Sequence, residues 1–160
     1  LVCVQAPIVH SLIDFYKVHN DDIILKLIES SINYLLFEAC KDQNGNSCSF
    51  RNSPIDKMHV HNSNIMVASL FYRYNDLQSD KRIIDLADDL IRFTLKHQNK
   101  DGSWYYSSNT KNIDNRHTGF VLRALSQICE IKLDETLEKS LDKGLQFYIN
   151  ELFEGVLPKW

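Results

Sequence analysis

Two short polar clusters contain the side chains best suited to chemistry. One has His59, His61, Asn62 and Asn64, and the other has Asp114, Asn115 and His117. A carboxylate close to imidazoles is suited to general acid–base catalysis, and amides both donate and accept hydrogen bonds. We therefore expect Asp114 to act as the acid or base, with His61 or His117 assisting it.

Both clusters fall at the start of a predicted helix. Helix N-termini offer unpaired N–H groups and the positive end of the helix dipole, which suits hydroxyls or anions. A simpler interpretation stays open, in which Asp114, Asn115 and Thr118 only cap their helix and the histidines bond nearby loop carbonyls. The residues alone do not decide between an enzyme and a binding module.

A metal site built on His59, His61 and His117 is disfavoured by spacing. His59 and His61 point to opposite sides of an extended chain, and lie about 200° apart on a helix. We predict no metal and no cofactor. A glycoside hydrolase would also need a second carboxylate about 5 to 9.5 Å from the first, and Asp56 and Asp101 are the candidates.

Composition fits an ordinary globular chain. The 160 residues are 44% hydrophobic and 24% charged, which is the size of one domain or of part of one. A net charge of −3 gives no reason to expect nucleic acid as a partner. No uncharged run approaches the roughly 18 residues of a membrane span. The chain lacks an initiating Met and a basic leader, so we expect it to be a piece of a longer protein.

Four cysteines, at positions 3, 40, 48 and 129, include no CxxC pair. A zinc ribbon or a thioredoxin-like site is therefore not expected. Cys40 and Cys48 flank a predicted turn and could pair. Reduced thiols in a cytoplasmic protein are the simpler prediction, because small apolar side chains fill cores well.

Helical spacing of apolar residues dominates the chain. It predicts six helices, over residues 7–19, 22–40, 61–75, 80–98, 118–131 and 134–152. Asp21 or Asp22 is expected to cap the second helix, and residues 42–51 are expected to form a polar loop. The third helix carries no charged residue between Val60 and Tyr72, and the fifth carries only Arg123 in its interior. The fourth, in contrast, has one apolar face and one charged face.

Helices that are apolar almost all round must be buried on all sides. We therefore predict an inner layer of odd-numbered helices wrapped by an outer layer of even-numbered ones, each consecutive pair forming a helical hairpin. Turn glycines Gly45, Gly102 and Gly155 follow the even helices, and each precedes an aromatic residue: Phe50, Trp104 and Trp160. This period of roughly 50 residues indicates a repeat architecture.

A family resemblance lies in the segments around these turns. Residues 98–104, Gln-Asn-Lys-Asp-Gly-Ser-Trp, resemble the QxxDGSW repeat of α/α-toroid proteins such as terpene cyclases and prenyltransferase-like domains. Together with residues 59–64, 113–120 and 155–160, this segment resembles a bacterial group of α/α-toroid proteins encoded with surface-polysaccharide genes. Some members of that group are labelled aminolevulinate dehydratase, a TIM-barrel enzyme class whose alternating strands and helices this sequence lacks.

The resemblance implies an all-α fold of tandem helical hairpins, about half of an (α/α)6 toroid, over residues 1–160. In such toroids the inner helices begin at one end of the ring and line a central cleft. Both polar clusters would then meet in a cleft that binds or processes a carbohydrate, in surface-polysaccharide metabolism. His59, Asn62, Asn64 and Asn115 would bind the sugar, while Trp104, Tyr105 and Tyr106 would stack on its faces.

Two other functions stay open at this stage. One is a non-catalytic helical-repeat module for binding or assembly, and a more distant one is a terpene cyclase or prenyltransferase-like enzyme. For the latter the sequence lacks an Asp-rich motif on an inner helix, since Asp88 and Asp89 fall on an outer one. The expected partners are a saccharide and either a second copy of the chain or the missing half of the toroid. Residues 100–104 are expected to serve mainly as a structural clamp between repeats.

Overall fold

The computed structural model describes residues 2–39, 41–44, 47–53, 55 and 57–159. Helices dominate this part of the chain. They are α1 (Val2–His19), α2 (Asp22–Asn33), α3 (His61–Asn75), α4 (Lys81–Lys96), α5 (Asn115–Cys129) and α6 (Glu135–Glu151). A π-helical turn, η1 (Tyr34–Glu38), extends α2, and two short hairpins are formed by β1 (Lys41–Asn44) with β2 (Ser47–Phe50) and by β3 (Phe153–Glu154) with β4 (Leu157–Pro158).

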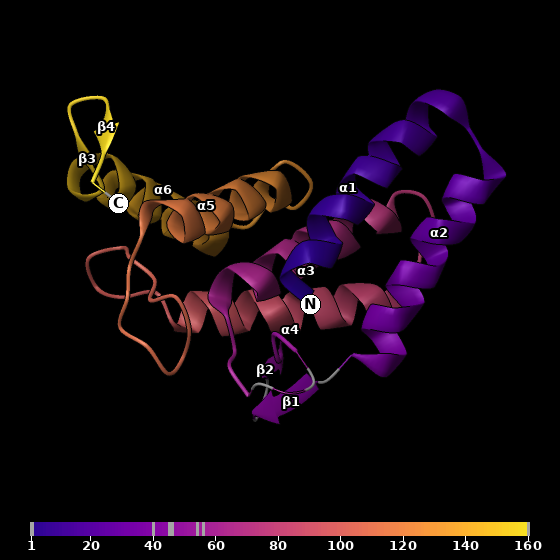
Figure 1. Cartoon of the computed structure of the whole chain (residues 1–160), viewed down its shortest axis with the longest axis horizontal. Helices are drawn as coiled ribbons and strands as arrows, with labels where there is room; N and C mark the ends of the chain where they lie inside the picture. Colours follow the sequence, from indigo (N-terminus) through magenta and orange to yellow (C-terminus); the bar gives the residue numbers. More distant parts are fainter. Residues whose placement is uncertain (1, 40, 45–46, 54, 56, 160) are drawn as a thin grey trace.

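The helices form two layers with α3 at the centre (Figure 1). α3 packs against α1 on one side, against α5 on another and against its own partner α4. α2 packs on α1, and α6 packs on α5, so each consecutive pair is a helical hairpin. The inner layer is α1, α3 and α5, and the outer layer is α2, α4 and α6. This confirms the predicted all-α architecture of tandem hairpins.

Burial of α3 explains why its sequence carries so little charge. Twelve of its fifteen residues are buried, including Ile65, Leu70 and Phe71. Three neighbouring helices cover it, so a charged side chain on most of its positions would lose its hydration. The outer helix α4 instead buries one stripe, which contains Ile83 and Leu90. The chain therefore places its core between the two layers.

Aspartates set the start of four helices. Asp21, Asp80, Asp114 and Asp134 are the N-caps of α2, α4, α5 and α6, and each side chain accepts a backbone N–H of the first turn. An N-cap carboxylate satisfies a donor that the helix itself leaves unpaired. Because Asp114 caps α5, that helix begins at Asn115, three residues before the predicted start.

Two predicted boundaries near the N-terminus were wrong. α1 begins at Val2 and continues through Pro7, because burial of Val2, Ala6 and Val9 on one face holds the helix together although the proline lacks an N–H for the carbonyl four residues earlier. Residues 42–51 do not form a loop: Lys41 pairs with Phe50 in the antiparallel hairpin of β1 and β2. Phe50 is 1% exposed, and β2 packs against α4, so burial of this one ring anchors the hairpin.

Several sequence predictions concern residues outside the described part of the chain. These are Cys40, Gly45, Asp56 and Trp160. Of the remaining cysteines, Cys3, Cys48 and Cys129 are free thiols, and burial raises the pKa of the Cys48 and Cys129 thiols. Gly102 and Gly155 both have positive φ, of 98° and 61°, as turn glycines do.

Candidate functional site

Asp114 and His117 form a close pair at the start of α5. Asp114 Oδ1 accepts the backbone N–H of His117 at 2.8 Å, and its Oδ2 lies 2.5 Å from the Nδ1 atom of the same residue. Both side chains are about one-third exposed, at 31% and 34%. The carboxylate therefore caps the helix and orients the imidazole at the same time, while the other ring nitrogen, Nε2, makes no hydrogen bond that involves the described residues.

The loop 104–108 connects this pair to the start of α3. The Tyr106 ring meets His117 edge-on, with the ring centroids 4.6 Å apart. The Tyr106 carbonyl accepts the backbone N–H of His61, and Val60 and Ser107 form an isolated antiparallel bridge. The first turns of α3 and α5 therefore lie at the same end of the inner layer, which we call the rim.

A small cavity of about 10 Å³ opens between these elements, with room for about one water molecule. We call it the rim pocket, and its lining is Asn62, Trp104, Tyr105, Tyr106, Asp114, His117, Thr118 and Val121. Asn62 is 5% exposed, and its Oδ1 atom has no hydrogen-bond partner within the described residues. A buried amide oxygen without a partner costs free energy, so a water or a ligand hydroxyl at this position would stabilise it.

His61 lies outside the rim pocket, although it neighbours Asn62. Its ring stacks on Phe93 at 5.2 Å and lies 4.9 Å from the ring of His97. Burial, reinforced by the nearby His97 and His59, lowers the pKa of His61 to about 3. His61 is therefore neutral, and it packs between α3 and α4, away from His117.

His59 and Asn64 bind the β1–β2 hairpin to the start of α3. His59 Nδ1 lies 2.8 Å from Ser49 Oγ, and its Nε2 lies 3.1 Å from a carboxylate oxygen of Asp42. The Asn64 amide accepts the N–H of Phe50 and donates to the carbonyls of Phe50 and Val60. Both side chains use their hydrogen-bonding groups within the fold.

Trp104 belongs to a clamp formed by residues 98–104. It is 2% exposed, and its indole N–H donates to the carbonyl of Thr94. Gln98 exchanges two hydrogen bonds with Ser140 of α6. A Cβ at Gly102 would lie 2.3 Å from the Lys143 carbonyl oxygen, so only glycine allows this approach. The segment joins α4 to α6, which confirms the predicted structural clamp.

Asn115 and Asp101 also hold structural contacts. The Asn115 amide accepts the hydroxyl of Tyr148 and donates to the carbonyl of Leu152, which ties α5 to α6. Asp101 accepts both the N–H and the hydroxyl of Ser103 within the clamp turn. Of the residues proposed from sequence, the structure brings Asn62, Trp104, Tyr105, Asp114 and His117 together, and it holds His59, His61, Asn64 and Asn115 apart from them.

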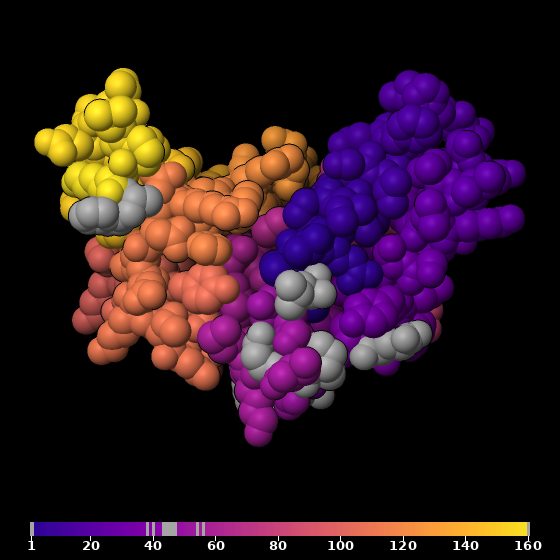
Figure 2. All heavy atoms as spheres, in the orientation of Figure 1, coloured from indigo at the N-terminus to yellow at the C-terminus, as the bar shows by residue number. Residues whose placement is uncertain are grey.

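A larger cavity, of about 140 Å³, lies between α1 and α5 above α3. We call it the concave pocket; the side chains that line it include His10, Asp14, Met66, Phe120, Arg123 and Gln127. Figure 2 shows the surface hollowed between the indigo α1 and the orange α5. Sequence reasoning missed it, because its walls come from helices more than a hundred residues apart and no local motif marks them. Among the described residues, no group of three or more His, Cys, Asp or Glu could hold a metal ion.

Comparison with known proteins identifies the architecture. No family model and no curated protein matches the sequence. A protein of Listeria innocua, Lin0763, superposes with a TM-score of 0.80 at 13% identity, over 94% of this chain and 46% of that one. The fold is part of an α/α toroid.

Two further solved structures share this arrangement of helical hairpins. Cellobiose 2-epimerase from Spirochaeta thermophila gives a TM-score of 0.78 at 10% identity, over 94% of this chain and 43% of that one. The mannosidase Bt3792 from Bacteroides thetaiotaomicron, of glycoside hydrolase family 76, gives 0.76 at 14%, over 93% and 44%. The chain thus spans a little under half the length of these toroids. None of the helices in its described part is long and apolar enough to cross a bilayer.

Proposed function

We propose that this chain is part of an α/α-toroid enzyme that binds and processes a saccharide at the rim. The observation that carries the proposal is the Asp114–His117 pair, which is partly exposed and borders the rim pocket. Tyr105 and Tyr106 beside it offer aromatic faces, and Asn62 Oδ1, which has no partner in the described part of the chain, can accept a hydroxyl. The solved toroids named above as an epimerase and a mannosidase support a carbohydrate as the ligand class.

In this proposal His117 transfers the proton, and Asp114 orients the imidazole ring of His117. Both oxygens of Asp114 are already engaged, one by a backbone N–H and one by the imidazole. A carboxylate at Nδ1 fixes the tautomer with a proton on that nitrogen and stabilises the imidazolium that forms on protonation. Nε2 is then the atom that accepts a proton from the substrate, or returns one to it. This reverses the roles that the sequence alone suggested.

The concave pocket opposes the isoprenoid alternative. His10, Asp14, Arg123 and Gln127 line it, and Phe120 is the aromatic ring among them. A terpene cyclase or prenyltransferase would need an apolar, aromatic wall around its hydrocarbon substrate. The resemblance of residues 98–104 and 113–120 to surface-polysaccharide proteins points to that class of saccharide, and the cysteine usage favours a cytoplasmic location; both remain part of the proposal.

We also propose that further helical hairpins complete the ring, supplied by the rest of a longer chain or by a second copy. α1 exposes an apolar stripe, formed by Val4, Ile8, Phe15 and Val18, on the face opposite its buried one. An inner helix with two apolar faces is expected to have neighbours on both sides.

The test uses two aspartates with the same capping geometry. Asp114→Asn keeps an N-cap acceptor but removes the carboxylate beside His117, and Asp134→Asn is the matched control on α6. In the full-length protein, assayed against a panel of neutral and acidic disaccharides, Asp114→Asn and His117→Gln should each lower turnover about 100-fold or more. Asp134→Asn should leave turnover unchanged.

Two outcomes would contradict the enzyme proposal. Turnover that persists unchanged in His117→Gln would remove this residue from the chemistry. Saccharide binding without turnover by the wild-type protein would instead favour a binding module of the same fold.

A further inference from the structure

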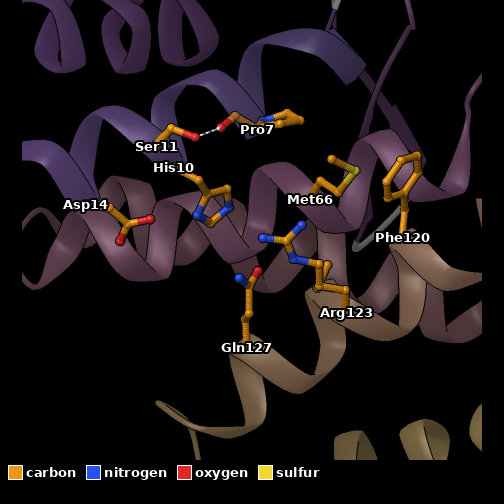
Figure 3. A pocket seen from close by; sticks show the side chains of 9 residues that line it. Pro7, His10, Ser11, Asp14, Met66, Phe120, Arg123 and Gln127 are labelled. Atoms are coloured by element: carbon orange, nitrogen blue, oxygen red, sulfur yellow. Dashed lines mark hydrogen bonds between the residues drawn. The ribbon is translucent and has the colours of Figure 1, made fainter.

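One of the side chains that line the concave pocket is positively charged and forms no ion pair within the described residues. Arg123 lies on α5 and is exposed, and none of the hydrogen bonds or ion pairs among the described residues involves its guanidinium. Figure 3 shows the guanidinium directed across the pocket toward His10 and Met66. An arginine offers five N–H donors in a planar fork that matches the oxygens of a carboxylate or phosphate.

The polar groups on the opposite wall of the pocket already pair with Arg73, so they do not neutralise the charge of Arg123. On α3, Arg73 donates to the Nδ1 atom of His10 at 3.0 Å and forms an ion pair with Asp14. Because arginine only donates, His10 Nδ1 must be an acceptor, and the Met66 carbonyl takes a hydrogen bond from the His10 ring. Burial and the charge of Arg73 lower the pKa of His10 to about 4, so His10 is neutral. Among the residues that the structure describes, Arg123 is thus left without a compensating carboxylate.

Gln127 adds a second donor one turn further along α5. Its Oε1 atom accepts the hydroxyl of Ser69 at 2.8 Å, which fixes the amide so that its NH₂ group is the side that remains to donate. Phe120, at the other end of the pocket, presents an aromatic ring (Figure 3). Phe120, Arg123 and Gln127 recur at spacings of three and four, so one face of α5 presents all three.

We propose that the concave pocket binds an oxyanion group of the ligand, a carboxylate or a phosphate ester, through Arg123 and Gln127. The sugar that carries this group would pack against Phe120. The saccharide part of this inference rests on the proposed function. The pocket is separate from the rim pocket, since Arg123 lies six residues beyond His117 on α5, an axial rise of about 9 Å.

The test compares three probes that share the glucose ring stereochemistry and differ in the group at carbon 6: D-glucuronate has a carboxylate, D-glucose 6-phosphate a phosphate ester and D-glucose an uncharged hydroxymethyl group. Calorimetric titration of the full-length protein should show that at least one anionic sugar binds while glucose binds far more weakly. Tighter binding of glucuronate identifies a carboxylate, and tighter binding of glucose 6-phosphate identifies a phosphate ester. Arg123→Gln should weaken the binding of the anionic sugar by about tenfold or more.

A control variant tests whether the loss of any exposed arginine would have the same effect. Arg82→Gln removes another exposed arginine, which pairs with Asp80 on the outer layer, and should leave binding unchanged. Binding is measured apart from turnover, so a protein that binds the anionic sugar but turns over no saccharide would contradict the enzyme proposal at the rim and leave this site standing. The inference is overturned if glucose binds as tightly as both anions, if neither anion binds, or if Arg123→Gln has no effect. Arg123 is exposed, so folding of the variant is not in question and is checked by its melting temperature.

Discussion

His61 and His117 are both imidazoles in the first turn of an inner helix, but solvent reaches them very differently. His61 is 2% exposed and stacks between Phe93 and His97, whereas the His117 side chain is 34% exposed and faces a carboxylate. Burial penalises the charged form of a histidine, so the first is held neutral. Residue type and spacing are therefore a weak guide to chemistry unless burial is known.

The low pKa of His61 predicts a specific loss of stability in acid. An unfolded histidine titrates near 6.5, whereas folded His61 titrates at about 3. Between these values the unfolded chain binds more protons, so the free energy of unfolding falls as pH drops below 6.5. At pH 5 this residue should account for about 2 kcal/mol of the loss. His61→Phe, which keeps the ring stack, should flatten the pH dependence measured by chemical denaturation.

A second buried histidine is the internal reference for this prediction. The pKa of His10 is lowered to about 4, so His10 contributes its own part of the acid slope in the wild type and in His61→Phe alike. An acid slope as steep in His61→Phe as in the wild type would show that His61 is charged in the folded protein.

At the scale of elements, the clamp of residues 98–104 depends on close packing against α6. A Cβ at Gly144 would lie 2.6 Å from Cζ3 of the buried Trp104 ring and 2.7 Å from a methyl group of Leu122. Alanine favours a helix over glycine by about 1 kcal/mol. The overlap outweighs this gain, so Gly144→Ala should lower the free energy of unfolding by about 1–3 kcal/mol.

A double-mutant cycle locates this effect at the contact. Trp104→Phe alone loses the indole hydrogen bond to Thr94, but its smaller ring makes room for the alanine. In the double variant, the cost of Gly144→Ala should therefore shrink, measured as non-additive free energies of unfolding. Lys143→Ala, at the exposed neighbouring position, should change stability by less than about 0.5 kcal/mol. If Gly144→Ala stabilised the protein instead, the Trp104 ring would have to move aside without cost, which would contradict the predicted overlap.

The sequence predicted the helices well because their signals are local. Capping aspartates such as Asp134 and the charge-free stretch of α3 mark the start and the burial of a helix without reference to the rest of the chain. The β1–β2 hairpin escaped prediction because its polar residues alternate little, and burial of Phe50 against α4 decides its place. The concave pocket escaped as well, since it depends on how α1 and α5 diverge over α3.

At the scale of the whole molecule, the two helices at the ends of the inner layer, α1 and α5, expose different kinds of side chain. α5 turns charged side chains, such as Arg116 and Arg123, to the surface. α1 instead exposes the apolar stripe of Val4, Ile8, Phe15 and Val18, with Ile8 55% and Val18 77% exposed. Solved toroids of the same fold are about twice as long as this chain, and their length allows additional hairpins beside such an edge.

The stripe predicts association of the 160-residue chain when it is produced alone. The Ile8 side chain exposes apolar surface to water, and removing this surface from water favours contact with a second copy. Sedimentation velocity should therefore show a concentration-dependent increase in mass. Ile8→Glu should suppress this increase, because a carboxylate in an apolar contact loses its hydration. Lys17→Glu, an exposed position off the stripe, should leave it unchanged. A chain that stays monomeric at every concentration, or that associates equally with Glu at position 8, would show that the stripe is an ordinary solvated face and that ring completion must use another surface.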